Sequence, residues 1–70
     1  MNDVVEARIN GQKRNVPAGL NLEELVEHFD QEPGAVVIEH NRQIVRGQQR
    51  RQITVQEGDN VEIVQFVGGG

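Results

Sequence analysis

The chain closes on three consecutive glycines, Gly68, Gly69 and Gly70, directly after an apolar run. Glycine loses the most backbone entropy on folding, so we expect 68–70 to be a flexible C-terminal tail. Such a tail can thread a narrow channel in a partner, with Gly68 and Gly69 inside it, and present the carboxylate of Gly70. Attack of this carboxylate on the α-phosphorus of ATP would give an acyl-adenylate. A sulfur donor could then displace AMP and leave a thiocarboxylate.

The other side chains offer little for catalysis. The chain has no cysteine, so it has no thiolate nucleophile and cannot carry sulfur as a cysteine persulfide. His28 and His40 lack the spacing of a recognised metal motif, and we discard an enzyme that would pair them with Glu24, Glu27 or Glu39. We therefore predict no catalytic residue, no metal site and no bound cofactor, with ATP used by a partner enzyme.

Length and charge narrow the function classes further. A chain of 70 residues buries only about 60% of its unfolded surface, which favours a carrier or binding module over an enzyme with an enclosed site. The formal charge of −4 argues against nucleic-acid and anionic-membrane partners. Arg46, Arg50 and Arg51 are expected to form a solvated basic loop, and the alternative is a docking contact for an acidic partner surface. Residues 1–6 do not resemble a signal peptide and the apolar runs are too short to cross a bilayer, so we expect a cytoplasmic protein.

The first elements are a hairpin and a helix. Residues 4–9 alternate as a strand, and Asn10-Gly11 predicts a type I′ turn into a second strand over 12–16, ended by Pro17. A helix is predicted over 21–30, where Asn21 and Glu24 have the spacing of a capping box. Its apolar side chains recur at intervals of three and four: Leu22, Leu25, Val26 and Phe29.

The second half of the chain is predicted to form short strands. They are expected over 36–40, 44–45, 53–55 and 61–67, with a loop over 46–52 and a turn at 57–59. One amphipathic helix with four or five strands predicts a two-layer α+β domain over 1–67, followed by the tail 68–70.

The run 56–70, QEGDNVEIVQFVGGG, resembles the C-terminal signature of the ThiS family, the sulfur carriers of thiamine biosynthesis. Three upstream pieces resemble the same family in order and spacing: Ile9-Asn10-Gly11, the capped helix that starts at Asn21, and 41–45. The similarity therefore covers nearly the whole chain.

The resemblance implies a ubiquitin-like β-grasp fold, with a mixed four- to five-stranded sheet packed on one main helix. It also implies that a ThiF-like, E1-type adenylyltransferase activates Gly70, that a sulfur donor protein loads it, and that thiazole synthase ThiG receives the sulfur. Two features depart from the family pattern. Gly68 is a third glycine and can be a spacer, and His40 stands where a strand would place an apolar side chain.

Two other classes stay open. The MoaD carriers of molybdopterin synthesis share the fold and tail, but they usually have a proline before the glycines, where this chain has Gln65, Phe66 and Val67. A ubiquitin-like modifier or non-covalent binding module is the other alternative, although Lys13 is the chain's one lysine and its one site for chain formation.

The last strand suggests where a partner docks. Its alternation places Val61 and Ile63 on one face and Val64 and Phe66 on the other. If the first pair faces the helix, then Val64 and Phe66 form an exposed apolar patch near the tail, suited to the activating enzyme. The alternative is that Phe66 covers a sheet edge or a loop.

Overall fold

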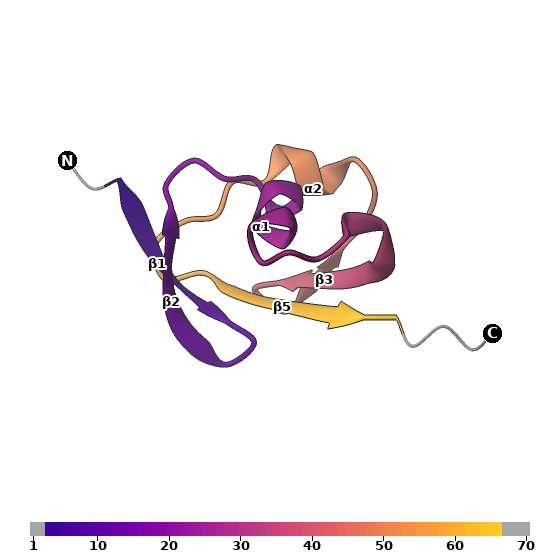
Figure 1. The fold of residues 1–70 in the computed structure, drawn as a ribbon, viewed down its shortest axis with the longest axis horizontal. Coiled ribbons are helices and arrows are strands. Elements are labelled where there is room, and N and C mark those ends of the chain that lie inside the picture. The colour runs from indigo at the N-terminus through magenta and orange to yellow at the C-terminus, as the bar shows by residue number, and fades with distance from the viewer. Residues whose placement is uncertain (1–2, 67–70) are drawn as a thin grey trace.

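Five strands form one mixed sheet, and helix α1 lies across one of its faces (Figure 1). The computed structural model describes residues 3–66. The strand order is β2-β1-β5-β3-β4, in which β1 and β5 are parallel and the other neighbours antiparallel. This confirms the predicted α+β class and β-grasp arrangement. The elements are β1 Val4–Ile9, β2 Gln12–Pro17, α1 Leu22–His28, the 3₁₀ turn η1 Pro33–Ala35, β3 Val36–His40, β4 Gln43–Val45, α2 Gln49–Gln52 and β5 Asn60–Gln65.

The apolar core lies between the sheet and helix α1. The predicted helix face is confirmed, because Leu22, Leu25 and Val26 are fully buried. Full burial of a side chain of this kind stabilises a fold by about 1.5–3 kcal/mol relative to exposure. The sheet contributes the alternate residues of its strands, as a two-residue period requires: Ala7, Ile9, Val16, Val36, Ile38, Val45, Val61 and Ile63.

Asn10 fixes both the first hairpin and the last strand. Asn10 and Gly11 have φ angles of 50° and 83°, which confirms the predicted type I′ turn. The Asn10 side chain also pairs with β5: Ile63 N donates to Oδ1 at 2.7 Å, and Nδ2 donates to Ile63 O at 3.2 Å. The amide therefore continues the parallel β1–β5 ladder beyond the end of β1.

Helix α1 begins as predicted and ends earlier. The capping box is present, with Glu24 N donating to Asn21 Oδ1 at 2.8 Å and Asn21 N donating to Glu24 Oε1 at 3.0 Å. The helix ends at His28 rather than Asp30 because Asp30 adopts a φ of 60°. The N–H groups of Asp30 and Gln31 then donate to the carbonyls of Glu27 and Val26, as in a Schellman motif.

The segment 46–55 differs most from the prediction. The expected loop 46–52 contains the short helix α2, and the expected strand 53–55 forms only an isolated bridge between Thr54 and Asn21. Its backbone pairs with the chain around the start of α1, since Leu22 N donates to Ile53 O and Val55 N donates to Leu20 O. These partners lie far away in sequence, so the local pattern could not identify them.

Smaller differences concern strand ends. Strand β2 includes Pro17, which pairs with Val4 on an edge strand, where a missing N–H is tolerated. Strand β4 starts at Gln43, one residue before the prediction, and β5 covers Asn60–Gln65. Residue 67, the predicted end of the last strand, lies outside the described residues.

A buried carboxylate joins the start of β5 to the end of β3. Asp59 Oδ2 lies 2.8 Å from His40 Nε2 and accepts from Gln56 N at 2.8 Å, while Oδ1 accepts from Asn41 Nδ2 at 3.2 Å. This pairing explains why His40 is accepted at a strand position expected to be apolar. Burial raises the pKa of Asp59, but the hydrogen bonds from Gln56, His40 and Asn41 outweigh it and hold the pKa below 3.8.

We expect Asp59→Ala to lower the free energy of unfolding by about 1–3 kcal/mol, because it leaves polar groups without their partner. The folded-state pKa lies below that of the unfolded chain, so the carboxylate's contribution is complete above pH 3.8 and disappears as pH falls through the folded pKa. Urea unfolding between neutral pH and pH 3 measures both effects. Equal losses of stability in both proteins on acidification would contradict this role of Asp59.

Candidate functional site

Strand β5 carries the chain to its C-terminal residues from the middle of the sheet. It lies between β1 and β3 (Figure 1), and its side chains at 61 and 63 are buried. The last described contact is Phe66 N donating to Ala35 O at 2.9 Å. The fold therefore fixes the point from which the chain continues toward Gly70. The predicted tail residues Gly68, Gly69 and Gly70 themselves lie outside the described residues.

The predicted alternation of β5 is confirmed. Val64 is 58% exposed and Phe66 is 63% exposed, so both lie on the face opposite the buried Val61 and Ile63. Val64 pairs with Val37 of β3 across the sheet, which extends the apolar surface by one strand. Phe66, the last described residue, is thus mostly outside the core.

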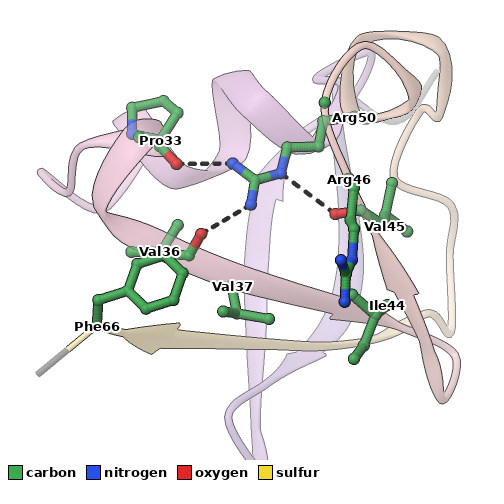
Figure 2. A pocket seen from close by; sticks show the side chains of 10 residues that line it. Pro33, Val36, Val37, Ile44, Val45, Arg46, Arg50 and Phe66 are labelled. Carbon is green, nitrogen blue, oxygen red and sulfur yellow. Dashed lines mark hydrogen bonds between the residues drawn. The ribbon is translucent and has the colours of Figure 1, made fainter. Parts of the chain in front are cut away.

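Phe66 also lines a groove that the sequence did not indicate. The groove has a volume of about 430 Å³ and lies where β3 begins and β4 and β5 end. Figure 2 shows Phe66 at one end, Val37 in the middle and Ile44 with Arg46 at the other end. Ile44 is 52% exposed. Ile44 and Arg46 are two residues apart on an extended segment, so their side chains lie on the same face. The strand expected at 44–45 was too short for the sequence to indicate this.

Arg50 is bonded within the fold, and the expectation of a solvated residue is wrong for it. Its Nη1 donates to Pro33 O at 2.6 Å, its Nη2 to Val36 O at 2.7 Å, and its Nε to Val45 O at 3.3 Å (Figure 2). A guanidinium has five donors in a fixed plane, so one side chain can satisfy three carbonyls. Arg50 therefore ties α2 to the β3 and β4 walls of the groove.

Arg51 and Arg46 are exposed, as predicted for a basic surface. Arg51 Nε donates to Glu23 Oε2 at 2.8 Å and so connects α2 to α1. With 69% of the Arg51 side chain exposed, such a pair contributes only about 0–1 kcal/mol. The predicted basic group therefore divides into the half-buried Arg50, which is bonded within the fold, and the exposed Arg46 and Arg51.

The two histidines have different surroundings. His28 is exposed and packs edge-on against Phe29, with ring centroids 5.1 Å apart. His40 is bonded to Asp59. Within residues 3–66, no three His, Cys, Asp or Glu side chains are placed to hold a metal ion, and no helix is long and apolar enough to cross a bilayer. This part of the chain provides an apolar, partly basic surface around Phe66, the last described residue.

Comparison with known proteins gives a consistent result. The ThiS family matches residues 5–70. The sulfur carrier protein ThiS of Escherichia coli is 36% identical over 61 residues, which are 87% of this chain and 92% of that protein. A thiazole synthase of Paramagnetospirillum magneticum is 39% identical over 62 residues, or 89% of this chain, but the chain spans only 19% of that enzyme's length.

The fold has a counterpart among solved structures. The crystal structure of the thiamine biosynthesis protein ThiS from Geobacter metallireducens superposes with a TM-score of 0.79 at 29% sequence identity. The similarity covers 94% of this chain and 100% of that one.

Proposed function

Because this chain belongs to the ThiS family of sulfur carriers, we propose that it carries sulfur as a thiocarboxylate on Gly70. A carboxylate oxygen of Gly70 attacks the α-phosphorus of ATP, and pyrophosphate leaves. Sulfur at the oxidation level of sulfide, supplied by a donor protein, then attacks the acyl carbon and displaces AMP. The product is a terminal thiocarboxylate, which is nucleophilic and needs no cysteine.

The observation that carries this proposal is the family match over residues 5–70, which includes the closing glycines. The fold is compatible with the role, because β5 is anchored on both sides and leads directly to those glycines. From residue 67 to Gly70 an extended chain spans about 13 Å. With no β-carbon after position 67, these residues can enter a channel too narrow for a side chain.

The partners follow from the same chemistry. A ThiF-like, E1-type adenylyltransferase would bind the ATP, so the carrier needs no cofactor of its own. Thiazole synthase would receive the sulfur for the thiazole ring of thiamine. The similarity between this chain and part of the P. magneticum thiazole synthase supports that destination. Val64 and Phe66 would dock the adenylyltransferase, since they are exposed next to the start of the tail.

Intact-mass spectrometry tests the carrier chemistry. After incubation with the adenylyltransferase, ATP and sulfide, we expect the protein to gain the mass difference between sulfur and oxygen, and fragmentation should place it on Gly70. Gly70→Ala should slow this loading by about 10²-fold, because a β-carbon displaces the carboxylate within the channel. Lys13→Ala is the control, since Lys13 is exposed on β2, at the sheet edge opposite β4 and away from the groove. Full loading of a chain that lacks Gly70 would refute the proposal.

Phe66→Ser tests the docking role. Loss of a central aromatic contact should raise the KM of the adenylyltransferase for the carrier about tenfold. The free energy of unfolding should change by less than about 0.5 kcal/mol, because Phe66 is largely exposed. Val4→Ser is the control, as Val4 is 46% exposed on β1. A collapse of thermal stability in Phe66→Ser would instead assign the residue to the core.

A further inference from the structure

The charges of this chain are strongly segregated. Residues 40–56 contain four arginines and no aspartate or glutamate. The other 3 basic residues accompany all 11 acidic residues, which leaves a formal charge of −8 outside this segment against +4 within it. The positive segment comprises β4, α2 and their connections, and it forms one wall of the groove beside Phe66.

Two of the four arginines are used by the fold, and two are not. Arg50 is bonded to three backbone carbonyls, and Arg51 pairs with Glu23. Neither Arg42 nor Arg46 forms an ion pair with another described residue, and both are exposed. An exposed guanidinium without an internal partner is available to a carboxylate from outside.

Arg46 lies next to an apolar recess. It lines the groove together with Ile44, Val37 and Phe66, and Figure 2 shows its side chain beside that of Ile44. In protein interfaces, an apolar side chain of the partner that is buried in such a recess supplies affinity. A charge at the rim of the recess orients the partner. On the same sheet face Glu39 and Glu62 pair across β3 and β5, so the positive surface ends there.

We propose that this surface binds an acidic segment of the activating enzyme, with one apolar side chain in the groove and a carboxylate on Arg46. The inference rests on the proposed function and identifies the chemistry of the partner's contact surface. Two observations favour this occupant: the local +4 charge within an otherwise acidic chain, and the continuity of the groove with Phe66, from which Gly70 is reached within about 13 Å. A partner seated here holds the chain where its tail can enter the active site.

Carrier-dependent ATP–pyrophosphate exchange by the adenylyltransferase tests this assignment. Arg46→Glu should raise the KM for the carrier about tenfold or more and leave kcat within about twofold, because a rim charge acts on encounter and orientation. Lys13→Glu is the matched control. It makes the same charge change at an exposed site on β2, at the sheet edge opposite β4, and its KM should stay within about twofold.

Ionic strength gives a second readout that a structural role would not affect. The KM of the wild-type carrier should rise with NaCl, and Arg46→Gln should flatten this dependence while Lys13→Gln should not. Thermal unfolding of each variant checks that the fold is retained.

The outcomes separate the two proposals. If the wild-type chain supports exchange but Arg46→Glu behaves like Lys13→Glu, the acidic docking surface is wrong and the carrier function stands. If the wild-type chain supports no exchange, both fall. Two further results would also overturn the assignment. One is a concentration-dependent dimer that Arg46→Glu dissociates, which would make the groove a contact between copies. The other is that Arg46→Glu weakens only the binding of thiazole synthase and leaves exchange by the adenylyltransferase unchanged.

Discussion

The parallel pairing of β1 with β5 is the constraint on which the rest of the structure depends. The ladder itself is short, joining Arg8 to Asn60 and Ile9 to Val61. The Asn10 side chain extends it on one side, and the backbone bond from Gly58 N to Glu6 O extends it on the other. This pairing places the last strand at the centre of the sheet. The chain therefore continues toward Gly70 from the central strand of the sheet, beside the groove and the exposed Phe66.

Sequence predicted the elements whose signals are local. Asn10-Gly11 determined the first turn, and Asn21 with Glu24 determined the start of α1, because each motif satisfies its own backbone groups. A turn at Asn41 and Arg42 joins β3 to β4, and Arg42 adopts a φ of 72° there, in a region that favours glycine or asparagine. Asn41 compensates by accepting from Asn60 N at 2.9 Å, a partner in another strand.

The parts that sequence could not predict depend on single long-range contacts. Helix α2 has no buried side chain and no apolar period, and Arg50 attaches it through carbonyls of three other segments. The groove follows from that attachment, since its walls come from β3, β4 and the end of β5. The composition suggested a uniform basic loop, whereas the contacts divide its arginines between the fold and the surface. The exposure of Val64 and Phe66 was predicted because alternation along β5 needs only one strand, but the Ile44 side of the surface needs the pairing of β3 with β4.

This small domain provides a surface for partners and anchors the strand that leads toward Gly70. We propose that the reacting atom is a carboxylate oxygen of Gly70. The most direct test is to trap the activated carboxylate. When the carrier, the adenylyltransferase and ATP are mixed with hydroxylamine and no sulfur source, we expect one hydroxamate, located on Gly70 by tandem mass spectrometry. A hydroxamate on an aspartate or glutamate side chain, or none while pyrophosphate is released, would contradict activation at Gly70.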